Sequence, residues 1–221
     1  MGMDGTLAAL SALGPYFAVD RYEPDKDWRP LSALLAPGPL ESRVEHTSRA
    51  LGLEGSADDV RVAASTVALG LFSQLVSPVL GATATATTPP AITLDSMWWR
   101  AAASGPWALA VDRLGGSDTL GTALTGAVAP LVERFAEGFS LSRTVLWGNA
   151  ASAVFGSVAA LHRAGAERTS QAAVLALDAL RREPLLGHGE IVDRHFVRTS
   201  CCLYYRVPGG GYCGDCVLAQ P

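Results

Sequence analysis

The four cysteines are the residues of this sequence whose type and spacing could support chemistry. All of them lie within the last 21 of the 221 residues, in the pattern C-C-x10-C-x2-C: Cys201, Cys202, Cys213 and Cys216. Thiolates bind soft metal ions and iron–sulfur clusters, and thiols also form disulfides and redox dithiols. Four thiols near one end of a chain that has no other cysteine indicate a common role.

Two metal-free roles do not suit this context. Disulfide frameworks are typical of small exported domains, whereas this sequence is 49% hydrophobic and opens without the basic segment of a secretory signal. A thioredoxin-like dithiol formed by Cys213 and Cys216 would need a following helix to lower its thiol pKa, and only five residues follow Cys216. A site in which four thiolates bind a metal is therefore favoured.

The spacing leaves two metals open. Structural zinc sites usually combine two short cysteine motifs, and this sequence has one such motif and one adjacent pair. Neighbouring side chains in a strand point to opposite faces, so Cys201 and Cys202 converge only if the backbone turns or the ligand is wider than one ion. A [2Fe–2S] cluster is wider and commonly takes four cysteines. The spacing favours this cluster and leaves structural zinc as the alternative.

The residues around the cysteines suit either metal. Gly209, Gly210 and Gly211 let the backbone approach the site and free N–H groups to bond to sulfur. Arg198 and Arg206 flank the adjacent pair, and cations near a cluster stabilise its reduced form. Two solvated arginines are the alternative interpretation.

A family resemblance favours the iron–sulfur cluster over zinc, which stays the alternative. The sequence R-T-S-C-C-L-Y-Y-R at 198–206, followed by C-G-D-C at 213–216, resembles the C-terminal signature of FhuF-type ferric-siderophore reductases. Weaker similarity extends to L-W-G-N-A at 146–150 and to 87–99. The resemblance implies that all four cysteines ligate a [2Fe–2S] cluster. It also implies that the protein reduces iron(III) in a hydroxamate-type siderophore in the cytoplasm.

The implied reaction needs one electron and no acid–base residue. Siderophores hold Fe³⁺ with hard anionic oxygens, and Fe²⁺ has a lower charge and prefers softer donors, so reduction loosens the chelate. No glycine-rich dinucleotide fingerprint follows a predicted strand. We therefore expect an external electron donor, either a ferredoxin or a flavin or NAD(P)H reductase. A net charge of −4 argues against a nucleic-acid partner.

Residues outside the cysteine motif could contact the siderophore. The pair Trp98 and Trp99 could form an apolar wall, although ordinary core packing is the competing interpretation. Asn149, in an apolar helix, needs a hydrogen-bond partner. The predicted substrate-binding residues are Arg198, Arg206, Trp98, Trp99 and Arg143.

Two stretches without charge, 62–94 and 144–161, raise the question of a membrane. Threonines, Gln74 and Pro78 interrupt the first, and glycines and Asn149 interrupt the second. We expect both to be buried helices of a soluble core and predict no transmembrane span. The predicted location is the cytoplasm, including a peripheral position at the inner face of the membrane.

The pattern predicts a mainly helical α+β fold with a small antiparallel sheet and a C-terminal cysteine-rich iron–sulfur segment. We expect helices over 56–77, from Asp118 with a new helix opening at Pro130, over 142–164 and over 169–182. Expected strands cover 83–88, 91–94 and 107–111, and 195–207 is β-like. We expect one ferric-siderophore reductase domain over 1–221, with proline-rich helices and loops over 1–40 and a cluster-binding segment over 191–221.

Overall fold

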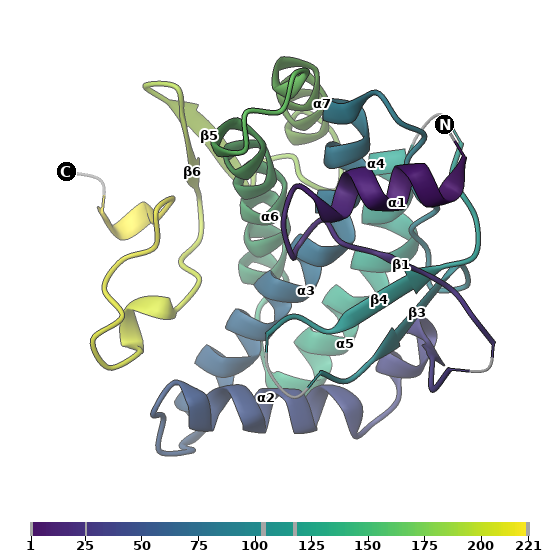
Figure 1. Ribbon diagram of the computed structural model, residues 1–221. Helices are drawn as coiled ribbons and strands as arrows, with labels where there is room; N and C mark the ends of the chain where they lie inside the picture. The colour runs from purple at the N-terminus through teal and green to yellow at the C-terminus, as the bar shows by residue number, and fades with distance from the viewer. Residues whose placement is uncertain (1, 25, 103–104, 117–118, 220–221) are drawn as a thin grey trace.

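Two long apolar helices, α3 (Ala57–Thr85) and α6 (Arg143–Arg163), lie side by side at the centre of the molecule (Figure 1). The computed structural model describes residues 2–24, 26–102, 105–116 and 119–219. The remaining helical elements surround this pair: α1 (Met3–Ser11), η1 (Leu31–Leu35), α2 (Pro39–Ala50), α4 (Thr119–Ala123), η2 (Leu124–Val128), α5 (Ala129–Phe139) and α7 (Thr169–Leu180). One hydrophobic core, from Leu7 to Leu185, joins them.

Helix α3 begins where the sequence predicts and ends later. The Ser56 hydroxyl accepts from the Asp59 N–H at 3.2 Å, and the Asp59 carboxylate accepts from the Ser56 N–H at 3.1 Å. The predicted end before Pro78 is wrong, because the helix continues to Thr85. A proline inside a helix costs about 3 kcal/mol. Burying one Val or Leu side chain recovers about 1.5–3 kcal/mol, and Val79 and Leu80 are fully buried.

The predicted strands at 83–88 and 91–94 are also wrong. Residues 83–85 form the last turn of α3, and among the described residues the second segment has no strand, with an isolated bridge between Pro90 and Leu114 beside it. Thr83 and Thr85 remain helical because their hydroxyls donate to carbonyl oxygens one turn earlier, at 3.1 and 2.9 Å. Their alternating β-branched pattern is thereby accommodated within a helix.

The sheet lies elsewhere and has four short strands in the order β1-β4-β3-β2. These strands are β1 (Asp20–Arg21), β2 (Arg29–Pro30), β3 (Met97–Arg100) and β4 (Ala108–Val111). The strand predicted at 107–111 is confirmed as β4, and Trp98 and Trp99 lie in β3, for which no strand was predicted. Strand β1 pairs with β4 in parallel and the other pairs are antiparallel, so the sheet is mixed. The fold is α+β and mainly helical, as predicted.

The second half of the chain follows the predicted helices closely. Pro130 lies in the first turn of α5, and the Ser142 hydroxyl accepts from the Val145 N–H at 3.2 Å to cap α6. Helix α7 ends at Leu180, two residues before the predicted end. The predicted start at Asp118 lies outside the described residues.

The β-like segment at 195–207 is only partly a strand. Strands β5 (Gly189–Val192) and β6 (His195–Arg198) form an antiparallel hairpin. The chain then leaves the hairpin and forms two short helical turns, η3 (Tyr204–Arg206) and η4 (Val217–Ala219).

Helices α3 and α6 are long and apolar enough to cross a membrane by length and composition alone. In the structure 78% and 56% of their most apolar windows are buried against the rest of the protein. This burial agrees with their interpretation as core helices.

Close packing of α1 on α3 yields a first prediction. A Cβ at Gly81 would lie 2.8 Å from Phe17 Cδ1 and 2.9 Å from Leu10 Cδ2. Gly81→Val should lower the free energy of unfolding by about 1–3 kcal/mol because the core is overpacked. Gly70→Val, in the same helix with no atom within 4 Å of its Cβ, is the control and should change stability by about 0.5 kcal/mol or less. Urea denaturation measures both, and equal losses would contradict the packing argument.

Candidate metal centre

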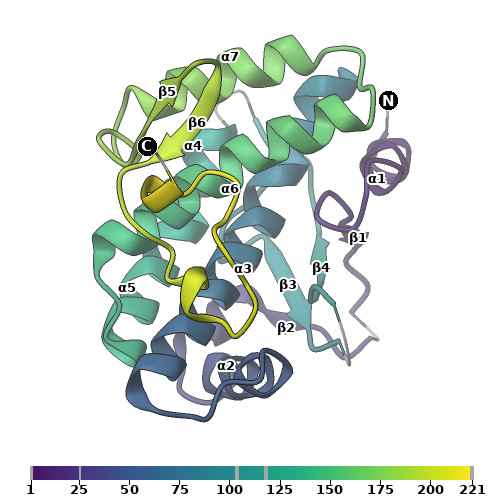
Figure 2. The ribbon, with the colours of Figure 1, turned by 90° about the vertical axis from the view of Figure 1, so that its left-hand side faces the viewer.

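The cysteine segment, residues 198–218, lies against the two central helices. Figure 1 shows it in yellow beside α3 and α6, and Figure 2 shows it passing in front of them, with β3 and β4 behind α3. After Cys201 and Cys202 the backbone turns at Leu203, whose φ of 71° is left-handed. The chain loops through the three glycines and returns to Cys213 and Cys216.

This path brings thiols together from the two ends of the motif. Cys202 Sγ lies 3.5 Å from Cys213 Sγ, and the Leu203 N–H donates to Cys201 Sγ at 3.3 Å. Cys202 and Cys216 are buried, whereas Cys201 and Cys213 are partly exposed. Within the described ranges, no group of three or more His, Cys, Asp or Glu side chains is arranged to hold a single metal ion.

The thiols differ in acidity. The hydrogen bond with Cys213 lowers the pKa of Cys202 to about 6, with a further contribution from the charge of Arg198. The same hydrogen bond raises the pKa of Cys213, and burial raises the pKa of Cys201. Cys202 is therefore converted to the thiolate, which is the metal-binding form, more readily than Cys201 or Cys213.

A buried polar network fixes the adjacent cysteine pair. Arg198 is 1% exposed and donates from Nη2 to Asn149 Oδ1 at 2.6 Å. Asn149 Nδ2 donates to both the carbonyl oxygen and the hydroxyl of Ser65 at 3.0 Å, and the Ser65 hydroxyl donates to the Cys202 carbonyl at 2.8 Å. The network thus connects α6 and α3 to the backbone of the motif.

Gly148 provides the space for this network. A Cβ at this position would overlap Ser200 Oγ and lie 3.0 Å from Arg198 Nη2. The Ser200 hydroxyl donates to the Thr144 carbonyl at 3.0 Å, so the strand leading to the cysteines lies directly on α6. The W-G-N sequence in this helix therefore combines close approach at Gly148 with hydrogen bonding at Asn149.

The second half of the motif has its own anchors. The Arg198 N–H donates to the Asp215 carbonyl oxygen at 3.2 Å, and the Ser152 hydroxyl donates to the Asp215 carboxylate. The Cys216 N–H donates to the Cys213 carbonyl at 3.2 Å and closes a turn between these cysteines. Both halves of the motif are therefore held against α6.

The surroundings of the thiols fit a [2Fe–2S] cluster. Among the described residues, Arg198 Nε and Nη1 are buried and have no hydrogen-bond partner. Unpaired donors on a buried cation are costly, and a group made of thiolates and sulfides is an anionic acceptor of hydrogen bonds. A buried cation with two unpaired donors, three residues before Cys201, is a suitable environment for such a group, which the four cysteines would ligate.

The predicted substrate-binding residues do not form one surface. Arg206, on the cysteine segment, ion-pairs with Asp58 of α3 at 3.0 Å. Arg143, the first residue of α6, ion-pairs with Glu133 of α5. Of these three arginines, Arg198 is buried and belongs to the polar network described above, whereas Arg206 and Arg143 are exposed.

The two tryptophans lie on the sheet, behind α3 as seen from the cysteine segment (Figure 2). Trp98 stacks on Tyr22 with ring centroids 3.9 Å apart, and the buried Trp99 stacks on Trp107 at 4.6 Å. The core interpretation therefore holds for Trp99, whereas Trp98 is half-buried and lies outside the hydrophobic core. A role in siderophore binding stays a prediction, without support from their positions.

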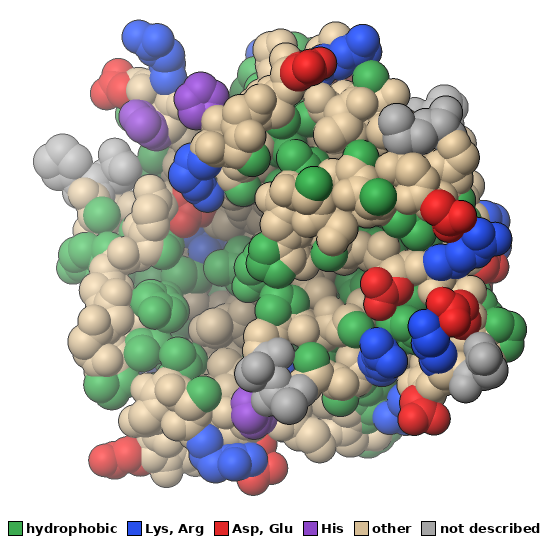
Figure 3. Space-filling model, viewed as in Figure 1, with side chains coloured by type: hydrophobic (Ala, Val, Ile, Leu, Met, Phe, Trp, Pro, Cys, Tyr) green, Lys and Arg blue, Asp and Glu red, His purple; other side chains and the backbone are tan. Residues whose placement is uncertain are grey.

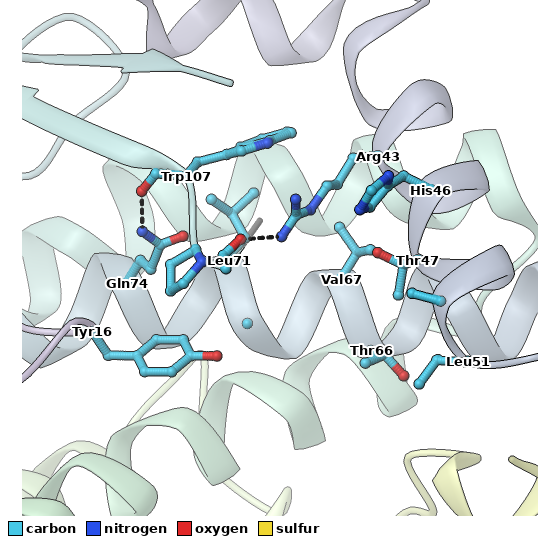
Figure 4. A pocket seen from close by; sticks show the side chains of 14 residues that line it. Tyr16, Arg43, His46, Thr47, Leu51, Thr66, Val67, Leu71, Gln74 and Trp107 are labelled. Atoms are coloured by element: carbon cyan, nitrogen blue, oxygen red, sulfur yellow. Dashed lines mark hydrogen bonds between the residues drawn. The ribbon is translucent and has the colours of Figure 1, made fainter. Parts of the chain in front are cut away.

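The surface has two hollows that were not predicted from the sequence. A cavity of about 300 Å³ lies between α2, α3 and the 105–107 loop (Figure 4). In this cavity Arg43 Nη2 donates to the Gly105 carbonyl at 2.6 Å, and Gln74 donates to the Trp107 carbonyl at 2.6 Å. An open hollow of about 430 Å³ lies at the α5–α6 corner and includes Arg143 in its lining.

The polar anchors of the cysteine segment were also missed in part. Asn149 was identified because an amide in an apolar helix needs a partner. Ser65, Ser152 and Asp215 gave no signal, because small polar residues at helix positions and one acid between two cysteines are ordinary in sequence.

Comparison with known families identifies the segment. Residues 198–218 match the family model described as the FhuF 2Fe-2S C-terminal domain. A search of curated proteins finds no match to this chain. The match covers all four cysteines together with Arg198 and Asp215, and it shows that the cofactor of this segment is a [2Fe–2S] cluster.

The close approach at Gly148 yields a second prediction. Gly148→Ala should displace Arg198 and Ser200 and lower the free energy of unfolding by about 1–3 kcal/mol. Gly156→Ala, in the same helix with no atom within 4 Å of its Cβ, is the matched control and should be neutral or stabilising by up to about 1 kcal/mol. Hydrogen exchange should show faster exchange over 198–216 in Gly148→Ala only. Unchanged exchange there would contradict the proposed anchoring.

Proposed function

We propose that this protein, which carries a FhuF-type [2Fe–2S] C-terminal domain, is a ferric-siderophore reductase. It transfers one electron to iron(III) in a hydroxamate-type siderophore and releases iron(II) in the cytoplasm. The observation that carries the proposal is the family match over a segment that contains the four cysteines and is anchored to the core by hydrogen bonds. The whole chain, 1–221, acts as one reductase domain.

The exposure of the cysteines supports electron transfer at the surface. Cys202 and Cys216 face the protein interior, and Cys201 and Cys213 are partly accessible. A group held by all four cysteines would thus be bound by two buried and two partly exposed residues. Both an electron donor and a bulky chelate could therefore approach it without entering the core.

The surface around this segment supports the same interpretation. Figure 3 shows hydrophobic side chains gathered on the C-terminal segment and a hollow between that segment and the helical body. Tyr205, Tyr212 and Leu218 are 41%, 61% and 48% exposed. Surfaces where several large apolar side chains are exposed together are common at sites of contact with partners or ligands.

The chemistry requires little from the other residues of the chain. When bound, the [2Fe–2S] group supplies single electrons. The cysteines hold it as thiolates, the Ser65–Asn149–Arg198 network keeps the adjacent pair in place, and Ser152 keeps the Cys213–Cys216 turn on α6. Because Fe²⁺ binds hard oxygen ligands less strongly than Fe³⁺, the chelate loosens without a proton donor from the protein.

The electrons come from a separate protein in this proposal, either a ferredoxin or a flavin or NAD(P)H reductase. The reductase works in the cytoplasm, where it is free or peripheral at the inner face of the membrane. These assignments follow from the proposed reaction and the absence of a dinucleotide fingerprint in the sequence.

Replacing one cysteine tests the proposal. Cys213→Ser should lose the visible cluster absorbance and acid-labile sulfide, because the cluster would lose one of four thiolates. Oxidation of the prereduced protein by ferrioxamine B, a ferric trihydroxamate, should fall by about a hundredfold or more. The measurements are iron and sulfide content after anaerobic reconstitution, and stopped-flow absorbance with a ferrous trap.

Gly156→Ala, which adds one methyl group to α6 with no atom within 4 Å of its Cβ, is the control and should keep the cluster and the reaction. Wild-type protein that binds zinc without sulfide would indicate a structural metal site and refute the proposal. A cluster that ferrioxamine B fails to oxidise would indicate an iron–sulfur sensor and refute the reductase assignment.

A further inference from the structure

Arg198 is the largest fully buried side chain of the described protein, and its hydrogen bonds are incomplete. Nη2 donates to Asn149 at 2.6 Å and lies 3.5 Å from the Val145 carbonyl oxygen. Nε and Nη1 have no partner among the described residues. Two of the three guanidinium nitrogens are therefore available to a further acceptor.

The charge of Arg198 is also unbalanced within the described part of the chain. No carboxylate ion-pairs with its side chain there; the nearby Asp215 carboxylate accepts from Ser152, and Arg198 contacts Asp215 only through the backbone. By contrast, Arg206 on the same segment is exposed and ion-paired with Asp58. A buried, unpaired cation is costly unless an anion lies next to it.

The thiols are the neighbouring groups that can become anionic. The Arg198 N–H donates to the carbonyl oxygen of Asp215, between Cys213 and Cys216, and Cys201 follows Arg198 by three residues, so Arg198 lies next to both halves of the motif. Its charge opposes the rise that burial causes in the pKa of Cys201, and it adds to the lowering that the hydrogen bond with Cys213 causes in the pKa of Cys202. Asn149 fixes one edge of the planar guanidinium, and Gly148 lets it approach α6 closely. The orientation of the remaining donors is thus set by the helix rather than by the cysteine loop.

We propose that Arg198 donates hydrogen bonds from Nε and Nη1 to sulfur atoms of the bound [2Fe–2S] group, and that this buried contact sets its reduction potential. Reduction adds one electron and no proton, so the negative charge beside the guanidinium increases by one. The cation therefore stabilises the reduced form more than the oxidised form and raises the potential. Arg198 acts as a positioning residue and does not contact the siderophore.

Burial makes Arg198 more effective in this role than Arg206. Water and salt screen the exposed Arg206, whereas a guanidinium with 1% exposure is screened much less. The planar fork also matters, because a lysine at this position would keep the charge but could not reproduce two fixed donors beside the Asn149 contact.

The inference rests on the cluster part of the proposed function and is independent of siderophore reduction. The first test compares Arg198→Gln, Arg198→Lys and Arg206→Gln, each loaded with cluster, at the potential that half-reduces the wild type. Arg198→Gln should lower the ratio of reduced to oxidised cluster by about tenfold, which is about 59 mV for one electron. Arg198→Lys should give a smaller decrease of about threefold, and Arg206→Gln should change the ratio by less than about twofold.

A second measurement detects the contact in the wild-type protein and uses variants only to assign it. In wild-type protein with ¹⁵N-labelled arginine, pulsed electron paramagnetic resonance of the reduced cluster should show a ¹⁵N coupling that persists in Arg206→Gln. Arg198→Lys should remove it. The same signal reports hydrogen bonding to sulfur whether or not any ferric chelate is reduced.

The outcomes separate this inference from the proposed function. A wild-type cluster without ¹⁵N coupling, or equal potential shifts in Arg198→Gln and Arg206→Gln, would overturn the role of Arg198 and leave the reductase proposal standing. Failure of ferrioxamine B to oxidise the cluster would overturn the reductase proposal and leave the role of Arg198 standing.

Discussion

The amide of Asn149 connects the three parts of the protein on which the cysteine motif depends. It donates to Ser65 on α3, accepts from Arg198 at the end of β6, and belongs to α6 itself. An amide buried in an apolar helix interface is unfavourable unless its donors and acceptor are satisfied. Because the partners lie on α3 and β6, satisfying Asn149 requires the two helices and the cysteine segment to meet in one arrangement.

The packing of α3 on α6 makes this arrangement rigid. Helix α3 contacts α6 along its length, and small residues on α6, such as Ala150 and Ala153, are buried. The hydroxyls of Ser77 and Ser157 meet across the helix pair at 2.7 Å, and Ser157 also donates to the Ala153 carbonyl. A second polar contact therefore holds the two helices together at a different point from the contact at the motif. Sliding of one helix along the other would break both contacts, so the position of the motif follows from the position of the helices.

The sequence predicted the features that depend on local chemistry. The cysteine spacing, the Ser56 and Ser142 caps and the proline in the first turn of α5 are each determined by a few neighbouring residues. The end of α3 was not predictable in this way, because burial of Val79 and Leu80 outweighs Pro78 and depends on distant residues. The two-residue strands β1 and β2 gave no pattern of their own and exist because β3 and β4 offer free edges. In the site, the sequence indicated that Asn149 needs a hydrogen-bond partner. It did not indicate that this partner is Ser65, because Ser65 lies 84 residues earlier in the chain.

The incomplete hydrogen bonding of Arg198 links folding of the segment to cofactor binding. Without an anion beside it, burial of the guanidinium opposes docking of the segment on α6, since its solvation is lost and only part is replaced. With thiolates and sulfides present, the same burial strengthens the attraction because the local dielectric constant is low. The packing of α3 on α6 also has contacts that do not involve this charge, such as the hydrogen bond between Ser77 and Ser157, so the stability of the helix pair depends less on the metal than that of the segment. Residues 198–216 should therefore be the part of the protein whose order depends most on the cluster, as in other sites where metal binding completes folding.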